Sequence, residues 1–341
     1  MKRVIAILMV LLLSFSLVAC GNGGTEQQTG ETKTIKIGTP NAADETDPYY
    51  MAACYIQDYF DANSDAGIKI EVYPNSTLGG ETEMFEGMQM GTVDMAVVNN
   101  SCATNYIPQC ALLDLPFILP DYATAKAVFS GELKDMLLGM YDGSGVKSLG
   151  LAIGGFRIPG TMGTEIRKPD DMKGLKMRCV ENQVYMNTYK AFGANALPMA
   201  FSEVLTGLQQ GTIDGTDFGA SVYWTSGFAD IIKTISVTNQ FCAVLSVDIS
   251  QKLWDELSAE QQSLLSTAAE EACAKALDAQ EANDAEKLQL LADAGVKIIP
   301  TEEIDLQAFK DCLGDVYAEY MDQIGQETYD KFVAEVERLQ G

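Results

Sequence analysis

The stretch from Pro169 to Gly215 decides the fold. It begins PDDMKGLKMR (169–178), continues through FGAN (192–195) and PMAFSE (198–203), and ends LQQGTIDG (208–215). In order, these segments predict a turn, a short strand that ends in an arginine, a helix, a second strand, a second helix and a third strand. An arginine at a strand end in an α/β unit is well placed to hold a carboxylate through two parallel hydrogen bonds. Arg178 is therefore the first candidate for a ligand-binding residue.

A related pattern occurs 120 residues earlier in the chain. EGMQMGTVD (86–94) resembles TGLQQGTID (206–214), and in both a glycine is followed by threonine, a β-branched residue and aspartate. The strands that precede the two segments, IKIG (35–38) and LKMR (175–178), are also of one type. We therefore expect two similar lobes, with a ligand cleft between the C-terminal ends of their strands.

The remaining periodicity completes an α/β fold. Alternating or apolar runs predict strands, and longer amphipathic runs predict helices. The first lobe has expected strands at 34–39, 68–73 and 93–98 and expected helices at 48–60 and 80–90. Strands at 148–153 and 241–247 are expected to cross between the lobes, followed by one long or two abutting helices at 258–294, a strand at 296–299 and helices at 305–324 and 326–339.

These elements predict a two-lobed α/β fold with a ligand cleft between the lobes and a long helix that spans both of them. We expect the first lobe to comprise residues 34–153 plus about 243–280. The second lobe is expected to comprise residues 154–242 plus about 281–341.

The N-terminus has the features of an export signal. Lys2 and Arg3 precede an apolar run from Val4 to Leu13, and LVAC (17–20) resembles a bacterial lipoprotein box. We expect residues 1–19 to be a signal peptide, Cys20 to carry lipid, and residues 20–33 to form a flexible tether outside the cytoplasm. The alternative is a transmembrane anchor, but the run is short for a span of about 20 residues.

Composition narrows the function. The net charge of −25 argues against binding to nucleic acid or docking on anionic lipid. The absence of histidine removes Ser-His-Asp and Cys-His catalysis and histidine-ligated zinc. Besides Cys20 there are seven scattered cysteines without a Cys-x-x-Cys pair, which favours free thiols over a disulfide scaffold. No metal and no cofactor are expected.

Four segments carry a resemblance to a known family: VYPNSTLGG (72–80), DLPF (114–117), KGLKMR (173–178) and QQGTIDG (209–215). They resemble the substrate-binding proteins of tripartite ATP-independent periplasmic (TRAP) transporters, of the dicarboxylate-binding type. The resemblance runs from about Thr34 to Leu339. It implies a two-lobed periplasmic-binding-protein fold, similar to the type II arrangement. It also implies a binding protein rather than an enzyme, which closes on an organic acid by a hinge motion and delivers it to a TRAP permease.

The resemblance also implies site residues. The motif arginine, Arg178, is expected to bind the ligand carboxylate, with a structural ion pair as its alternative. Arg157, in GFR (155–157), matches a second, assisting arginine, although Arg167 lies nearby in sequence. Phe201 matches an apolar position that lines the family cleft.

One departure from the family pattern affects the ligand. Phe218 stands where family members commonly have a ligand-binding asparagine, so an apolar wall is expected, extended by Tyr223 and Trp224 unless these belong to the lobe core. Asp217 is expected to pair with an arginine or to bind an amine. In the first lobe the expected ligand contacts are Asn41, Asn99, Asn100 and Tyr49. The predicted ligand is a monocarboxylate with an apolar or aromatic body. A ligand-sensing lipoprotein or an extracytoplasmic enzyme acting on an organic acid remains the alternative.

Overall fold

The computed structural model describes residues 32–63 and 67–341. The predicted signal peptide, most of the tether and the lipidation site Cys20 lie outside the described residues. The first parallel unit comprises β1 (Lys33–Gly38), α1 (Pro48–Ala62), β2 (Ile68–Tyr73), α2 (Glu81–Met90) and β3 (Met95–Asn99). Its strands lie in the order β2-β1-β3. We call this unit the first lobe.

The second parallel unit comprises β5 (Lys176–Cys179), α7 (Gln183–Ala191), β6 (Asn195–Pro198), α8 (Phe201–Gln209) and β7 (Gly215–Phe218). Its strands lie in the order β7-β5-β6, so β5 is central, as β1 is in the first unit. We call this unit the second lobe. The turn, strand and helix sequence predicted from the stretch at Pro169 is confirmed here.

Two long strands join the lobes. β4 (Val146–Thr161) and β9 (Phe241–Ser250) are antiparallel partners, and β9 also pairs with β3 while β4 also pairs with β7. Their shared ladder is interrupted between Ser148 and Gly150 and between Ile153 and Phe156. These are the crossing strands expected near 148–153 and 241–247, and the structure extends both of them. The short strands β8 (Thr234–Ser236) and β10 (Lys297–Ile299) pair with each other.

The repeated sequence produces the same local structure twice. Gly91 and Gly211 end α2 and α8 with positive φ angles of 76° and 68°, a conformation that glycine adopts without strain. Asp94 then accepts a hydrogen bond from the backbone N–H of Lys36 at 3.0 Å, and Asp214 accepts one from that of Lys176 at 2.9 Å. In each lobe this aspartate ties the end of the repeat to the central strand.

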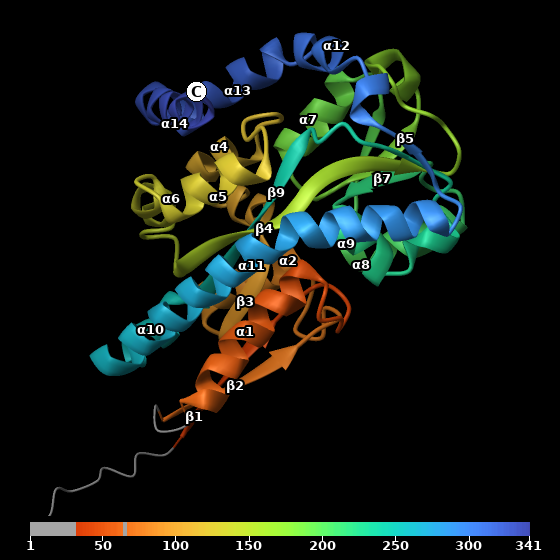
Figure 1. Ribbon diagram of the computed structural model, residues 1–341. Helices are drawn as coiled ribbons and strands as arrows, with labels where there is room; N and C mark the ends of the chain where they lie inside the picture. The colour runs from red at the N-terminus through yellow and green to blue at the C-terminus, as the bar shows by residue number, and fades with distance from the viewer. Residues whose placement is uncertain (1–31, 64–66) are drawn as a thin grey trace, which may run out of the picture. The chain divides into compact units, whose positions relative to one another are not determined.

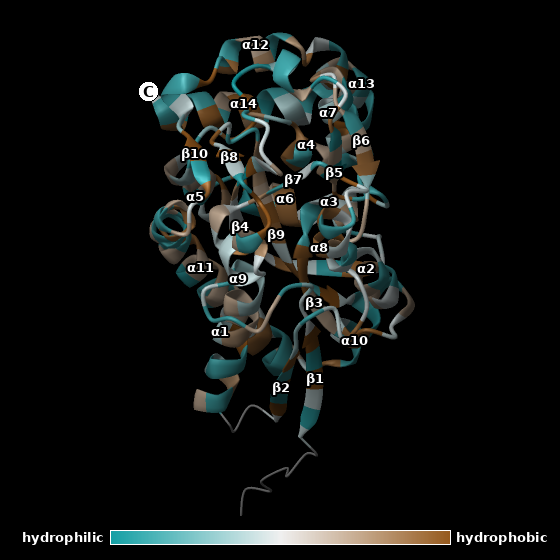
Figure 2. Ribbon diagram, turned by 90° about the vertical axis from the view of Figure 1, so that its right-hand side faces the viewer, coloured by the Kyte–Doolittle hydropathy of each residue, from teal (hydrophilic) through white to brown (hydrophobic). Residues whose placement is uncertain are grey.

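A single 35-residue helix, α11 (Ala259–Asp293), occupies the region where one or two helices were expected. It packs against α1, β4 and α9 (Ala220–Thr225), so it spans both lobes, as Figure 1 shows. A capping box starts it: Ser258 accepts a hydrogen bond from the backbone of Gln261, whose side chain accepts one from the backbone of Ser258. The apolar residues lie mainly on the inner strands, and the outer faces of the helices are more polar (Figure 2).

The remaining helices fill the space around the crossing strands. The segment expected as a helix at 305–324 forms two helices instead, because the chain turns at Cys312–Leu313. The helices around the crossing strands are α3 (Asn100–Thr104), α4 (Ala111–Asp114), α5 (Tyr122–Ser130), α6 (Lys134–Gly139), α10 (Gln251–Glu256), α12 (Leu306–Asp311), α13 (Gly314–Ile324) and α14 (Gln326–Gln340).

The expectation of free thiols can be compared with the described residues. All seven cysteines in that part of the chain are free. Within residues 32–63 and 67–341, no helix combines the length and apolarity that crossing a bilayer requires.

Candidate functional site

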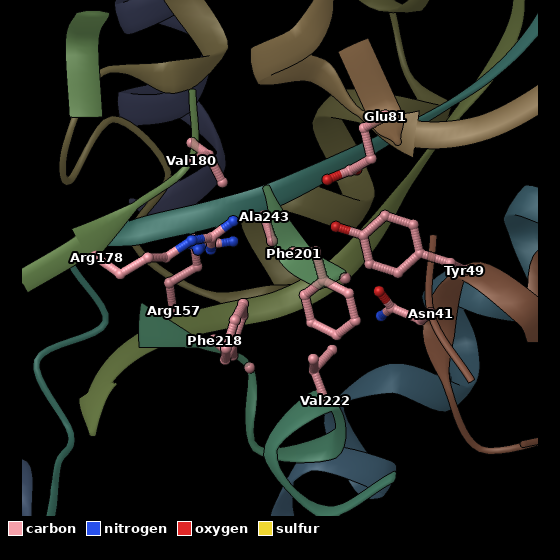
Figure 3. Close-up of a pocket in the computed structure, with 12 residues that line it drawn as sticks. Asn41, Tyr49, Glu81, Arg157, Arg178, Val180, Phe201, Phe218, Val222 and Ala243 are labelled. Carbon is pink, nitrogen blue, oxygen red and sulfur yellow. The ribbon is translucent and has the colours of Figure 1, made fainter. Parts of the chain in front are cut away.

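A cavity lies where the strand ends of the two lobes meet. The space in it that a water molecule can occupy is about 10 Å³, room for about one water, so the side chains around it are closely packed. A second cavity shares Glu81, Arg178, Val180 and Phe201 with it and leads toward the first-lobe loops. The first cavity is lined by Asn41, Tyr49, Glu81, Gly154, Arg157, Arg178, Val180, Phe201, Phe218, Gly219, Val222 and Ala243 (Figure 3).

Arg178 lies at the end of β5 and is 2% exposed. Its Nε and Nη2 both donate to the carbonyl oxygen of Met199, at 2.9 and 2.7 Å, whereas Nη1 is buried without a partner among the described residues. No carboxylate of the described chain lies within ion-pair distance of this guanidinium. Burial, and then the charge of Arg157, lower the pKa of Arg178. A buried cation with an unused donor is suited to an anionic ligand.

The positive charge of Arg157, on β4, is balanced by a carboxylate of the protein itself. Its Nη2 lies 2.8 Å from Oδ1 of Asp217 and its Nε 3.1 Å from Oδ2, so the two side chains form a bidentate pair. Burial works to lower the pKa of Arg157, but the charge and hydrogen bonds of Asp217 outweigh it and raise the pKa. Gln240 donates a further hydrogen bond to Asp217 at 3.2 Å. Of the two roles expected for Asp217, the structure shows pairing with an arginine.

Aromatic rings form one wall between these groups. The guanidinium carbons of Arg178 and Arg157 lie 5.3 and 5.5 Å from the centroid of the Phe218 ring, within the range of cation–π contacts. Phe201 meets Phe218 edge to face with the ring centroids 5.4 Å apart. Phe218 therefore supports both arginines and presents an apolar surface to the cavity.

The opposite end of the cavity consists of oxygen-bearing side chains from the first lobe (Figure 3). Asn41 uses its Nδ2 to donate to Asp47 at 2.8 Å, which leaves its carbonyl oxygen available. Glu81 begins α2, and its Oε1 accepts from the backbone N–H of Asn99 at 2.8 Å. Desolvation raises the pKa of Glu81, while that hydrogen bond and the charges of Arg178 and Arg157 oppose the rise.

Sequence reasoning missed Glu81. Its position could have indicated it. Glu81 is the first residue of the helix that directly follows the glycines of the VYPNSTLGG motif, and the start of that helix lies at the edge of the sheet where the strands end. Val180, Val222 and Ala243 were also missed, because small apolar side chains carry no chemical signature in a sequence.

Five of the residues expected at the site do not line this cavity. Asp217 lies behind Arg157, and Asn99 caps α3 by accepting from the backbone of Ser101. Asn100 is wholly buried and donates to Cys110 and Asp114. Tyr223 is also wholly buried, and Trp224 packs against the same hydrophobic core. No group of three or more potential metal ligands occurs within the described ranges.

Comparisons with known proteins place this geometry in context. Residues 40–323 match the family described as bacterial extracellular solute-binding protein, family 7. The chain is 30% identical to the 2,3-diketo-L-gulonate-binding periplasmic protein YiaO of Escherichia coli, over 89% of this chain and 91% of the relative. It is 31% identical to the C4-dicarboxylate-binding periplasmic protein DctP of Rhodobacter capsulatus, over 82% and 85% of the two chains.

Solved structures show the same architecture. The sugar acid binding protein of Advenella mimigardefordensis in complex with galactonate is 26% identical and superposes with a TM-score of 0.85, covering 91% of this chain and 99% of that one. A TRAP periplasmic solute-binding protein of Polaromonas bound to D-erythronate is 30% identical, with a TM-score of 0.83, over 88% and 98%.

Proposed function

The chain belongs to family 7 of the bacterial extracellular solute-binding proteins, the DctP family of TRAP transporter binding proteins, and from that premise we propose that it captures a monocarboxylate with a largely apolar body. The observation that carries the proposal is Arg178. Arg178 lines the cavity and its buried Nη1 has no partner in the described chain, whereas neighbouring Arg157 has its own carboxylate.

The charges in the cavity favour a single carboxylate. Arg157 and Asp217 cancel each other, which leaves Arg178 to balance either Glu81 or a ligand carboxylate. A monoanionic ligand is accommodated when Glu81 takes up a proton, and desolvation favours its protonated form. A second ligand carboxylate would find no unpaired lysine or arginine among the lining residues.

The lining favours an apolar ligand body. The lining includes the apolar side chains of Phe201, Phe218, Val180 and Val222, and Phe218 leaves no side-chain donor or acceptor at its position. The two structural neighbours described above bind galactonate and D-erythronate, which carry several hydroxyl groups. We expect this chain to prefer acids with fewer hydroxyl groups.

The family assignment gives an extracytoplasmic transport protein with a TRAP permease as its partner. The finer proposal is that lipid on Cys20 anchors the protein to the membrane, which rests on the LVAC segment (17–20) and the basic, apolar sequence before it. Capture and release of an acid need neither a nucleophile nor a general base. We therefore propose a binding role without turnover.

The test compares Arg178→Ala with Arg167→Ala. Arg167 pairs with Glu165 and Glu303 outside the cavity, and its side chain is 36% exposed. A thermal-shift screen of aliphatic, aromatic and hydroxylated monocarboxylates first identifies a bound acid, and calorimetry then measures its affinity. Loss of a bidentate charge-assisted contact predicts a weakening of about 100-fold or more for Arg178→Ala. Arg167→Ala should bind normally.

Two results would contradict the proposal. One is wild-type affinity for the acid in Arg178→Ala. The other is consistent preference of the wild-type protein for dicarboxylates over monocarboxylates. The fold of the variant is checked by its unfolding curve, which should show a moderate loss of stability, because Ala removes a buried side chain and its two hydrogen bonds to Met199 but leaves no unpaired carboxylate.

A further inference from the structure

One asparagine side chain joins the second lobe to α3 and α4, the helices that follow the first lobe, beside the cleft. Asn182 is the N-cap of α7, and its Oδ1 accepts from the backbone N–H groups of Val184 and Tyr185, at 2.8 and 3.3 Å. Its Nδ2 donates to the carbonyl oxygen of Ser101 at 2.9 Å and to Oδ2 of Asp114 at 3.0 Å. The carboxamide thus holds a second-lobe helix with its oxygen and uses both of its N–H bonds elsewhere.

The acceptors of those two bonds lie in two short helices, Ser101 in α3 and Asp114 in α4. Ser101 lies in α3, directly after β3. Asp114 is tied to the same helix, because it accepts from Asn100 at 3.0 Å and from Thr104 at 2.6 Å. Asn105, the C-cap of α3, donates to the carbonyl oxygen of Glu181 at 2.8 Å, so a second bond crosses at the same place.

The side chains that form this junction are buried. Asn182 is 2% exposed and Asp114 1% exposed. No lysine or arginine of the described chain pairs with Asp114, and its carboxylate is held by three neutral donors. Burial raises the pKa of Asp114 to about 7, opposed by its hydrogen bonds from Thr104, Asn100 and Asn182. A buried carboxylate that loses one of these donors is left partly unsatisfied, which is costly.

The junction borders the ligand cavity without touching it. Ser101 and Glu181 line the second cavity together with Arg178, which lies four residues before Asn182. If the lobes separated, the Asn182 amide would leave Ser101 and Asp114 and become hydrated. Contacts that exist only in the closed state bias the equilibrium toward closure. We propose that Asn182 and Asp114 form a latch that keeps the cleft closed, which makes Asn182 a positioning residue for ligand retention.

The latch does not depend on which acid the protein binds, so it can be tested before the ligand is identified. Asn182→Asp keeps the size of the side chain and its oxygen cap on α7, since aspartate is as good an N-cap as asparagine. It removes both donated bonds and places a carboxylate beside Asp114. Asn187→Asp is the matched control: it lies on the same helix, and its Nδ2 donates to Glu319 at the surface, at 2.8 Å.

The readout is hydrogen exchange of the full purified chain, followed by mass spectrometry. For Asn182→Asp we expect residues 99–105 and 180–185 to exchange about tenfold faster or more, with the strands β1 and β5 unchanged. Asn187→Asp should exchange like the wild type in those segments. Adding Asp114→Asn to Asn182→Asp restores one amide-to-carboxylate bond, so exchange should return most of the way.

The same variants also test how long the protein retains its ligand. The probe is whichever acid native mass spectrometry finds in the purified wild-type protein, and its displacement is followed by stopped flow. A faster off-rate with an unchanged on-rate supports the latch. Wild-type exchange in Asn182→Asp, or no recovery in the double variant, overturns it. Either result leaves the role of Arg178 untouched, because that role is measured by affinity in Arg178→Ala.

Discussion

Arg157 and Asp217 form a buried ion pair, with Nη2 of the arginine 2.8 Å from Oδ1 of the aspartate and their side chains 3% and 0% exposed. The neighbouring Arg178 has no such carboxylate within the described ranges. Two arginines side by side therefore have different tasks: the charge of one is balanced by the protein, and the charge of the other is available to a ligand. Phe218 lies against both guanidinium groups and keeps them in place.

Asp217→Ala should destabilise the fold strongly. Breaking a buried pair by removing one partner leaves an uncompensated charge, at a cost of about 3–5 kcal/mol. Denaturation in urea measures the free energy of unfolding. The double variant Arg157→Met with Asp217→Leu should recover most of the loss, because it removes both charges together. A cost below about 1 kcal/mol for Asp217→Ala would mean that water or a rearranged side chain replaces the aspartate.

Phe218→Asn should shift the ligand preference toward hydroxylated acids. Asparagine would restore a donor and an acceptor at this position and remove the ring that contacts Phe201 and the arginines. Calorimetry should show weaker binding of apolar monocarboxylates and tighter binding of sugar acids such as galactonate. Loss of the buried ring should also lower the free energy of unfolding by about 3–5 kcal/mol.

The control for this change is Phe218→Leu, which keeps the surface apolar and should keep the preference. Equal selectivity in Phe218→Asn and Phe218→Leu would show that the hydroxyl groups of a ligand do not reach this wall.

The sequence was sufficient to predict the parts of this fold that depend on local pattern. The strand that ends near Arg178 and the repeated glycine caps at Gly91 and Gly211 follow from periodicity and turn chemistry, and the structure has both. The break between α12 and α13 was missed, although Gly314, which directly follows the turn at Cys312 and Leu313, was a local signal for it.

The site was predictable only where a side chain carries a distinctive chemistry. Arg178, Arg157, Phe201 and Phe218 line the cavity as expected. Tyr223 carries the same kind of ring as a ligand-stacking residue, yet its hydroxyl group bonds to backbone carbonyls within the core. The partners of Glu81 and Asn182 lie 18 and 81 residues away in the chain, so their roles depend on tertiary contacts that no local pattern encodes.

Binding of a monoanion should be coupled to proton uptake at Glu81. Desolvation already raises the pKa of Glu81, and a ligand carboxylate in the same cavity would raise it further. The groups that face it are Arg178 and Arg157, which oppose the rise, and Glu181, which adds to it. A group that binds protons more tightly in the complex takes up protons on binding, so affinity should fall as the pH rises through the pKa of Glu81.

Calorimetry in buffers with different heats of ionisation measures this uptake. Glu81→Gln keeps the shape of the side chain and cannot ionise, so its affinity should depend less on pH. An unchanged pH dependence in Glu81→Gln would assign the proton to another group. A ligand with an ammonium group should bind the wild-type protein without uptake, because the ligand itself then balances Glu81.

Asp248→Asn should stabilise the protein at neutral pH. Asp248 is wholly buried on β9, where it accepts one hydrogen bond from Ser246 at 2.7 Å, and its Oδ1 has no partner in the described chain. Burial raises its pKa to about 7. The native state therefore holds a proton that the unfolded chain releases near pH 4, so the stability contributed by this group is complete below about pH 4 and is lost as the pH rises to 7.

Asp248→Asn cannot ionise, so it should not lose stability in this way as the pH rises. The free energy of unfolding of Asp248→Asn, relative to the wild type, should grow by about 2–4 kcal/mol between pH 4.5 and pH 7.5. Asp135→Asn, at an exposed aspartate, is the control and should show no such growth. Chemical denaturation at several pH values measures the difference. A flat difference for Asp248→Asn would mean that Asp248 is ionised in the native state, which would require a cation or water to satisfy Oδ1.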